Sequence, residues 1–347
     1  MGVERLLVTL TEISATDFDL TKTLESGQVF HWEKIDKGFG GTIGDQAVYV
    51  EQRGNLLKGR AGASELDCLK QSSSGEVGRE GKTLDRIIAH YFALDHPLAQ
   101  ICASFPEDEP MKAACDFCRG LRIIRQPKWE CLATFICSSM KQVAHIRQIS
   151  HALRRRFGET RKIDRHSVYT FPSPARLAKS SERDLRECAL GYRAKNLLAT
   201  AHLVANGDVD LEKWAALADV DLRARLCELP GVGAKVANCV MLFAYERLRA
   251  FPIDVWIERV LRENYFPRAR KLNATRLRTF TQEHFGEHGG YAQQYLFHYA
   301  RMNKRVKGGR PAVGAKKNGT RPASVPQSRD LGAASGACPS KMTKARA

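Results

Sequence analysis

The stretch LPGVGAKVANC, residues 229–239, places two glycines just before a lysine that begins an otherwise apolar segment. Over residues 234–244 only Lys235 and Asn238 are polar, so the pattern predicts a helix that is buried nearly all round. Burial and the positive end of a helix both disfavour a protonated amine. Because a neutral amine is a nucleophile, Lys235 is a candidate for covalent catalysis. A lysine that reaches outward to solvent or to a phosphate stays open as the alternative.

Gly231 and Gly233 flank Val232 between two predicted helices. Glycines permit a tight reversal and leave backbone N–H groups accessible at the start of the second helix. Such N–H groups bind an anion, typically a phosphate, without reading any base. The turn therefore predicts a site that binds the phosphates of a nucleic-acid backbone. An ordinary helix–turn–helix joint stays open as the alternative. It is not a P-loop, because Ala234 precedes the lysine and Val236 follows it.

Nineteen residues after the lysine, the segment FPIDVW (251–256) contains an acidic side chain behind a proline. Asp254 lies where an N-cap would begin the next helix, and capping alone would explain it. A carboxylate close to Lys235 would also stabilise positive charge that develops on a sugar ring. The spacing along the chain leaves open whether the two side chains meet.

The charge distribution gives a weaker indication of a partner. Of the formal net charge of +17, the last 47 residues carry +11, from 12 basic side chains and one acidic one. The rest of the chain is only mildly basic, which favours nucleic acid modestly over a solvated surface. No apolar run approaches the roughly 20 residues of a membrane helix, and the first residues lack the pattern of a signal peptide.

The chain contains ten cysteines, which we expect to be reduced because no signal peptide is present. Most occupy helix-like apolar patterns, where cysteine packs as a small hydrophobic residue. Cys115 and Cys118 have the spacing of a metal or redox pair, but no second pair follows at a zinc-like distance. We therefore interpret this pair as helix packing and predict no metal site.

The elements that must position these residues predict an α+β fold. The first 60 or so residues alternate like short strands, with hairpin turns at Gly44-Asp45 and Gly54-Asn55. The later part is almost wholly helical, and its predicted helices are 84–95, 109–119, 128–140, 142–157, 174–189, 193–206, 211–227, 234–246, 255–264, 272–286 and 289–303. We predict a small N-terminal antiparallel sheet and helix domain over 1–115, a large all-α body over 116–303, and a disordered basic tail over 304–347.

Taken together, these segments resemble a known family. The matching stretches follow one another in order and span residues 26 to about 300: SGQVFHW (26–32), GLRIIRQPKWECLATFICSS (120–139), FPSPARLA (171–178), LGYRAKNL (190–197), LPGVGAKVANC (229–239), FPIDVW (251–256) and GGYAQQYLF (289–297). The chain resembles the eukaryotic-type 8-oxoguanine DNA glycosylase/AP lyases and their bacterial relatives, within the helix-hairpin-helix GPD glycosylases. Only the tail lies outside the match.

The resemblance implies a base-excision mechanism. The damaged nucleotide would be extruded from the duplex, because its glycosidic bond cannot be reached inside the stack. Lys235 would then attack C1′ of the deoxyribose and displace the base, while Asp254 would stabilise the oxocarbenium-like charge. The amine would form a Schiff base with the opened sugar, and β-elimination would cut the strand on the 3′ side. Neither a metal nor a cofactor is required, since both groups are side chains.

The resemblance also implies roles in the base pocket and on the DNA. The Gly27 carbonyl would accept the N7 hydrogen of 8-oxoguanine, and Gln293 would read the pairing edge of the base. Phe297 and Cys239 would sandwich the base.

On the other strand, Tyr192 and Arg193 would wedge into the gap and touch the orphaned cytosine. In better-known members an asparagine run follows ICSS, with an arginine five residues after the first asparagine. Here Met140, Lys141 and His145 replace those groups. Because the missing groups help to read the opposite cytosine, the preference for the base opposite the lesion stays open. Met140 is a candidate apolar side chain to fill the gap that the extruded nucleotide leaves in the base stack.

Two further departures concern DNA contact and cofactors. Trp256 replaces a histidine that usually contacts a phosphate, so we expect a changed grip there. Some relatives hold an iron–sulfur cluster with four cysteines after the catalytic aspartate, whereas only Cys338 follows here, so no cluster is expected.

Two rival functions are weighed against this one. An alkylated-purine glycosylase is disfavoured because such relatives generally lack a lysine at the hairpin. A non-catalytic helix-hairpin-helix DNA-binding module is disfavoured because Lys235 and Asp254 are both present. The expected partner is double-stranded DNA that contains an oxidised purine, with no membrane, and the protein is expected to be a monomer. It would act in the cytoplasm or nucleoid of a bacterium, or in the nucleus of a eukaryote.

Overall fold

The computed structural model describes residues 10–62, 77–269 and 271–307. Its sheet consists of β1 (Thr11–Ser14), β2 (Glu33–Ile35), β3 (Gly38–Ile43), β4 (Gln46–Arg53) and β5 (Leu56–Ala61). All neighbours pair antiparallel, in the order β1-β5-β4-β3-β2. Gly44 and Gly54 have φ values of +58° and +59° at the two predicted hairpin turns, which confirms those turns.

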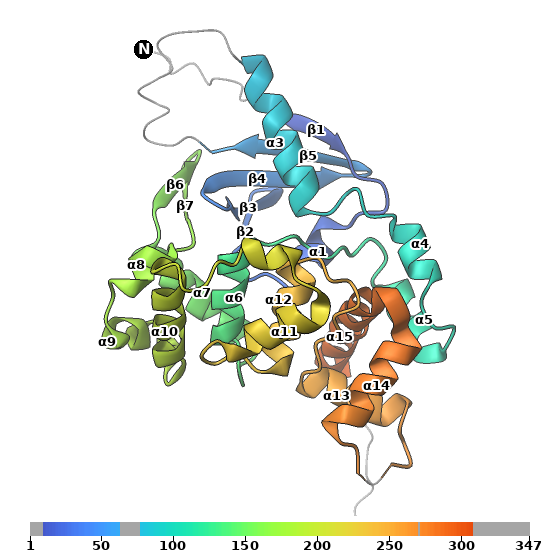
Figure 1. Ribbon diagram of the computed structural model, residues 1–347. Helices are drawn as coiled ribbons and strands as arrows, with labels where there is room; N and C mark the ends of the chain where they lie inside the picture. Colours follow the sequence, from blue (N-terminus) through green and yellow to red (C-terminus); the bar gives the residue numbers. More distant parts are fainter. Residues whose placement is uncertain (1–9, 63–76, 270, 308–347) are drawn as a thin grey trace, which may run out of the picture. The chain divides into compact units, whose positions relative to one another are not determined.

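Two helices share an apolar core with this sheet. Helix α1 (Leu20–Glu25) begins at Asp19, whose side chain accepts a hydrogen bond from the Lys22 amide at 2.8 Å. Helix α3 (Val77–Tyr91) packs across β1, β3 and β5, as Figure 1 shows. The apolar core between sheet and helix includes Trp32, Val48, Leu57, Ile88 and Phe92, each at most 3 % exposed.

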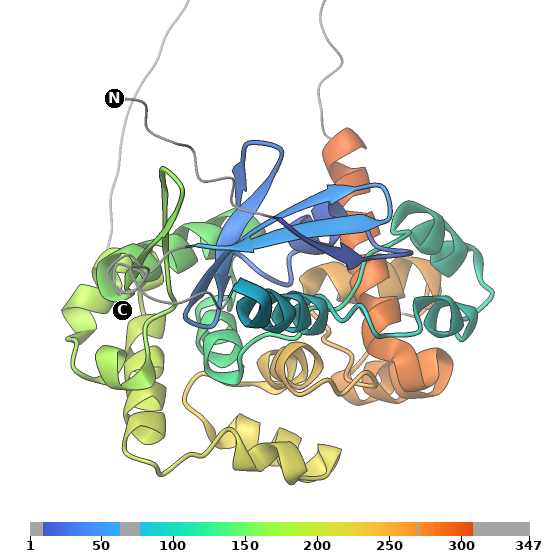
Figure 2. The ribbon, with the colours of Figure 1, turned by 90° about the horizontal axis from the view of Figure 1, so that it is seen from above.

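The remaining helices form the larger part of the described chain (Figures 1 and 2). In chain order they are α4 (Leu98–Ala103), α5 (Glu109–Phe117), α6 (Lys128–Cys137), α7 (Val143–Phe157), α8 (Pro174–Ala178), α9 (Glu182–Leu185), η1 (Arg186–Leu190), α10 (Arg193–Ala205), η2 (Lys213–Ala216), α11 (Asp219–Glu228), α12 (Ala234–Ala244), α13 (Val255–Asn264), α14 (Ala274–Phe285), η3 (Gly286–His288) and α15 (Gly289–Lys307). An N-terminal antiparallel sheet followed by a mostly helical body confirms the predicted fold class.

The helical body has one continuous apolar core that reaches back toward the N-terminus. Helix α12 packs against α6 and α11, and α15 packs against α5 and α13. The core therefore joins α4 and α5 to the helices that follow them. The division of the chain at residues 115 and 116 stays a prediction.

The body contains one element that was not predicted, and it is therefore not all-α. Residues 160–169 form a β-hairpin of β6 (Thr160–Ile163) and β7 (His166–Tyr169), not part of an all-helical region. The hairpin lies against β4 and β3, and Ile163 and Val168 share a small core with Ile35 and Tyr49. The N-terminal sheet thus supplies the apolar surface that stabilises this hairpin.

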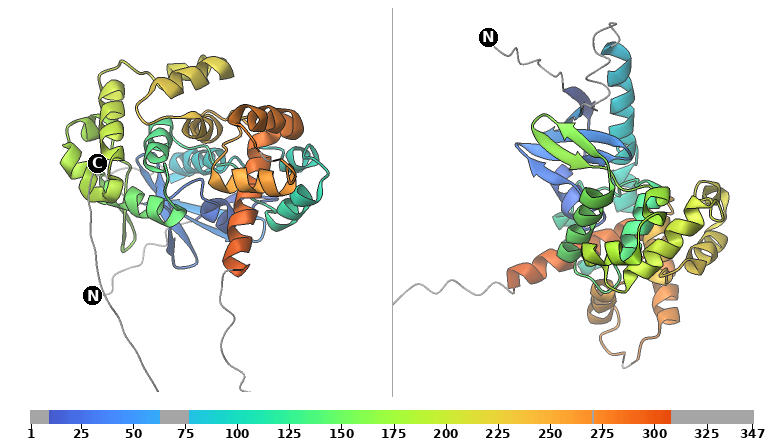
Figure 3. Two further views of the ribbon diagram at one scale, coloured as in Figure 1. Left: turned by 90° about the horizontal axis from the view of Figure 1, so that it is seen from below. Right: turned by 90° about the vertical axis from the view of Figure 1, so that its left-hand side faces the viewer.

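The last helix is longer than predicted. Helix α15 continues to Lys307, beyond the expected end at residue 303, and its last turns extend away from the other helices in Figure 3. The rest of the predicted basic tail, residues 308–347, lies outside the described residues. Within the described ranges, no helix is both long enough and apolar enough to cross a bilayer.

Candidate active site

The glycine turn joins α11 to α12 as predicted. Gly231 has φ +80°, and a Cβ placed there would lie 2.7 Å from the Asn196 side chain, so this position requires glycine. Val232 is buried and anchors the turn in the core. Gly233 is exposed, a Cβ placed on it would meet no atom within 4 Å, and no side chain caps α12. The first N–H groups of α12 are therefore accessible to an anion.

Lys235 lies in the first turn of α12 with its amine directed inward. Its Nζ donates a hydrogen bond to Ser138 Oγ at 3.2 Å and lies 5.2 Å from the centroid of the Phe135 ring. Both contacts come from the region of α6, against which α12 packs. The prediction that α12 is buried nearly all round is confirmed, with these buried residues: Val236, Ala237, Cys239, Val240, Met241, Leu242 and Phe243.

Asp254 caps α13, as its position behind Pro252 predicted. Its Oδ1 accepts a hydrogen bond from the Ile257 amide at 2.8 Å. Burial raises the pKa of the Asp254 carboxyl, while the Ile257 amide and the charge of Lys235 oppose this rise. The carboxylate and the amine are therefore close enough to interact electrostatically. No ion pair within 4.0 Å joins them in the described part of the chain.

Cys239 completes this group one helical turn after Lys235. The thiol is 3 % exposed, and burial raises its pKa to about 11, with the charge of Lys235 acting in the opposite direction. The sulfur is therefore a neutral, polarisable contact surface at neutral pH.

The four residues assigned to the base pocket come from three separate segments. Gly27, with φ +89°, follows α1, and a Cβ placed on it would lie 3.1 Å from Phe297 of α15. Gln293 lies one turn earlier on α15 and is 4 % exposed, yet its Oε1 accepts no hydrogen bond from the described residues. A buried amide oxygen without a donor indicates a missing polar partner.

Two large apolar side chains beside the site are exposed. Met140 is 93 % exposed and has φ +52°, and Tyr192 is 58 % exposed. Arg193, however, is 5 % exposed and points inward, with Nε donating to the Ser139 carbonyl at 2.8 Å. Its guanidinium lies 4.3 Å from the centroid of the Tyr192 ring. In this structure Arg193 therefore supports the turn that carries Met140.

The other predicted DNA contacts lie on the first turns of two helices or just before them. Lys141 is half-buried just before α7, and His145 is exposed on its first turn. Trp256 is half-buried on the first turn of α13, with the Arg259 guanidinium 5.7 Å from its ring.

Sequence reasoning missed three residues of this site. Ser138 and Phe135 contact the Lys235 amine, although almost a hundred residues separate them from it. Arg301 lies against Gly27 and Phe297. Of these three residues, only Arg301 could have been found from the sequence. It lies four residues after Phe297, and this spacing places both side chains on the same helix face.

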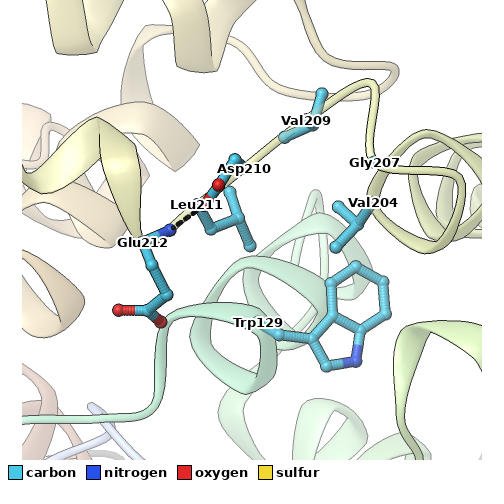
Figure 4. Close-up of a pocket in the computed structure, with 7 residues that line it drawn as sticks. All are labelled: Trp129, Val204, Gly207, Val209, Asp210, Leu211 and Glu212. Atoms are coloured by element: carbon cyan, nitrogen blue, oxygen red, sulfur yellow. Dashed lines mark hydrogen bonds between the residues drawn. The ribbon is translucent and has the colours of Figure 1, made fainter.

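A pocket of about 300 Å³ lies elsewhere in the body (Figure 4). It is lined by Trp129, Val204, Gly207, Val209, Asp210, Leu211 and Glu212. It contains none of the predicted site residues, and its Asp210 carboxylate is already hydrogen-bonded to the Glu212 amide at 3.1 Å. In the described ranges no three His, Cys, Asp or Glu side chains come together as metal ligands.

Comparison with known proteins places these features in a family. The model of the 8-oxoguanine DNA glycosylase N-terminal domain matches residues 10–132, and that of HhH-GPD superfamily base excision DNA repair proteins matches residues 133–282. A probable N-glycosylase/DNA lyase of Methanothermobacter thermautotrophicus is 29 % identical over 315 residues, which are 84 % of this chain and 96 % of that protein.

Two solved structures are similar over nearly their whole length. MBOgg1 in complex with a low-affinity DNA ligand is 31 % identical with a TM-score of 0.75, over 85 % of this chain and 96 % of that one. The 8-oxoguanine glycosylase/lyase of Clostridium acetobutylicum, bound to double-stranded DNA with cytosine opposite 8-oxoguanine, is 28 % identical with a TM-score of 0.72, over 86 % and 100 %. The chain therefore belongs to the 8-oxoguanine DNA glycosylase family of HhH-GPD base excision repair enzymes.

Proposed function

We propose that this protein is a bifunctional DNA glycosylase/AP lyase that removes 8-oxoguanine, and the related formamidopyrimidine, from double-stranded DNA. The observation that carries the proposal is the position of the Lys235 amine. It points inward to Ser138, interacts electrostatically with Asp254, and begins a helix whose N–H groups are accessible to an anion. A nucleophile, a charge stabiliser and a phosphate grip thus occur together.

The reaction follows from these positions. The lone pair of the Lys235 nitrogen forms a bond to C1′ as the glycosidic bond breaks, and the electrons of the broken bond leave with the base. The Asp254 carboxylate stabilises the positive charge on the sugar during this step. The nitrogen then loses a proton, and the sugar ring opens to give a protonated Schiff base. Loss of a C2′ proton finally expels the 3′ phosphate oxygen and cuts the strand.

The pocket residues support the choice of substrate. Gln293 keeps a buried amide oxygen without a donor, which suits the N–H groups on the pairing edge of guanine. Phe297 and Cys239 offer two polarisable surfaces for a flat ring, and the Gly27 carbonyl would accept the N7 hydrogen that 8-oxoguanine has and guanine lacks. We therefore propose these four residues as the base pocket.

The exposed side chains suggest how the other strand is held. We propose that Tyr192 and Met140 enter the gap left by the extruded nucleotide, with Lys141, His145, Trp256 and the Gly231–Gly233 turn on the backbone. An apolar Met140 would fill the space without reading a base, so we expect weak discrimination among the four opposite bases. Arg193 would reach an orphaned cytosine only after leaving the Ser139 carbonyl.

The remaining properties are proposals of the same kind. The protein would act as a monomer on the cell's DNA, in the nucleoid of a bacterium or the nucleus of a eukaryote. The basic segment 304–347 would serve as a salt-dependent DNA tether.

Borohydride trapping on a duplex with one 8-oxoguanine tests the proposal directly. The wild type should form a covalent protein–DNA adduct, and Lys235→Gln should form none. Lys128→Gln is a matched control, because Lys128 is paired with Glu212 at the edge of the pocket in Figure 4, outside the proposed site. An adduct with Lys235→Gln, or its loss with Lys128→Gln, would contradict the role of the amine.

A further inference from the structure

Arg301 is a charged side chain on the wall of the proposed base pocket. A Cβ placed on Gly27 would lie 2.6 Å from its Nη1, and its guanidinium carbon lies 5.5 Å from the centroid of the Phe297 ring. Gln293, Phe297 and Arg301 are spaced four residues apart on α15, so all three side chains lie on one face of that helix. The arginine is therefore part of the same wall as the two pocket residues before it.

The position of the guanidinium is fixed from outside the pocket. Its Nη2 donates to the Glu25 carbonyl, two residues before Gly27, and lies 3.5 Å from His298 Nδ1. Burial lowers the pKa of His298 to about 4, with the charge of Arg301 acting in the same direction, so the imidazole is neutral at neutral pH. The neutral imidazole therefore places no second positive charge beside the guanidinium.

A guanidinium at this place has a definite chemical preference. It presents fixed N–H donors and a permanent positive charge, so it favours a base edge with carbonyl oxygens and disfavours an edge with an amino group. In 8-oxoguanine the edge around N7 carries two carbonyl oxygens, at C6 and C8. In 8-oxoadenine the C6 oxygen is replaced by an amino donor, while the N7 hydrogen and the C8 oxygen are kept.

We propose that Arg301 is a specificity-determining residue that reads the N7 edge of the extruded base and selects oxidised purines with two carbonyl oxygens there. This inference rests on the proposed glycosylase function and adds a contact to it. The entering base takes over the face of Phe297, and the guanidinium, anchored through the Glu25 carbonyl, donates to the base edge beside Gly27.

The test compares single-turnover excision of 8-oxoguanine and 8-oxoadenine, each opposite cytosine, by the wild type and Arg301→Met. Methionine keeps most of the side-chain length and removes the charge and the donors. The ratio of the two excision rates should fall about 10- to 100-fold in the variant, as expected for a lost hydrogen bond from a charged donor. Arg301→Lys should keep part of the ratio, because it keeps the charge.

Cleavage of a duplex with an abasic site separates this inference from the function on which it rests. That step involves no base, so Arg301→Met should slow cleavage of this substrate far less than it slows excision of 8-oxoguanine. Arg119→Met is the matched control, because it removes an exposed guanidinium whose ion pair is with Asp116.

An unchanged ratio with intact abasic cleavage would overturn the inference alone, as would equal losses on both purines. Absence of abasic cleavage in the wild type would overturn the proposed function itself.

Discussion

Asp254 combines two roles that a pair of substitutions can separate. Its Oδ1 caps α13 through the Ile257 amide, and its negative charge interacts with Lys235. Asparagine keeps the capping oxygen but not the charge, whereas alanine removes both. We therefore expect Asp254→Asn to lose excision while the protein stays folded, and Asp254→Ala to lose excision and stability together.

The size of each effect follows from the contacts. An N-cap is worth about 1 kcal/mol, so the alanine variant should be less stable than the asparagine variant by about that amount. For a chain of this size this corresponds to a difference in Tm of about 2 °C. Loss of a charge that stabilises the transition state should reduce the single-turnover rate about 10²- to 10³-fold in both variants.

The pH dependence has a definite sign. The pKa of Asp254 is raised in the folded protein by burial, so the folded state binds this proton more tightly than the unfolded state does. Ionisation of the carboxyl therefore costs folding free energy at neutral pH. Asp254→Asn should be at least as stable as the wild type at pH 7, and this advantage should fade as the pH falls toward the ordinary value of about 3.9.

Thermal unfolding between pH 5 and 8, combined with single-turnover excision, tests the whole argument. An equal loss of Tm in Asp254→Asn and Asp254→Ala would contradict the capping role of Asp254. Excision of 8-oxoguanine by the asparagine variant within tenfold of the wild-type rate would contradict the role of the charge.

Four other predictions concern the glycine turn, the opposite base and the core. Gly231→Ala should lower the unfolding free energy by about 1–3 kcal/mol in urea titrations, because alanine is strained at φ +80° and meets a side chain there. Gly233→Ala should leave stability within about 0.5 kcal/mol, because a Cβ has open space, and should weaken DNA binding in a fluorescence anisotropy titration. Met140→Asn should sharpen the preference for cytosine in an excision panel with 8-oxoguanine opposite each of the four bases. Glu130→Gln should destabilise the fold by about 3–5 kcal/mol, because it leaves the buried Arg154 without its carboxylate; no urea-detected loss would contradict the pairing.

Local patterns in the sequence were sufficient for the backbone of the site. The glycine turn, the buried helix after it and the cap at Asp254 each depend on a few neighbouring residues. The hairpin turns at Gly44 and Gly54 are local in the same sense. Such features are predictable because the interactions that fix them lie within one or two helical turns or one turn of the chain.

Contacts between distant segments were not predictable from one sequence. The Lys235 amine donates its hydrogen bond to Ser138, which lies at the end of α6. Only the packing of α6 against α12 brings these two residues together. The hairpin at residues 160–169 gains its apolar neighbours from the N-terminal sheet. Arg193 points to the Ser139 carbonyl, a partner that no spacing rule connects to it.

The turn between α6 and α7 links the position of the Lys235 amine to that of an exposed side chain proposed to enter the DNA. Ser138 touches the amine, Ser139 is clamped through its carbonyl, and Met140 projects outward, all in consecutive positions. Two peptide units span at most about 7 Å, which limits the distance between Ser138, the contact of the proposed nucleophile, and Met140, the side chain proposed to enter the duplex. Insertion or deletion of a single residue here would shift Met140 relative to Ser138. We expect such a change to impair the enzyme more than replacement of any one of the three side chains.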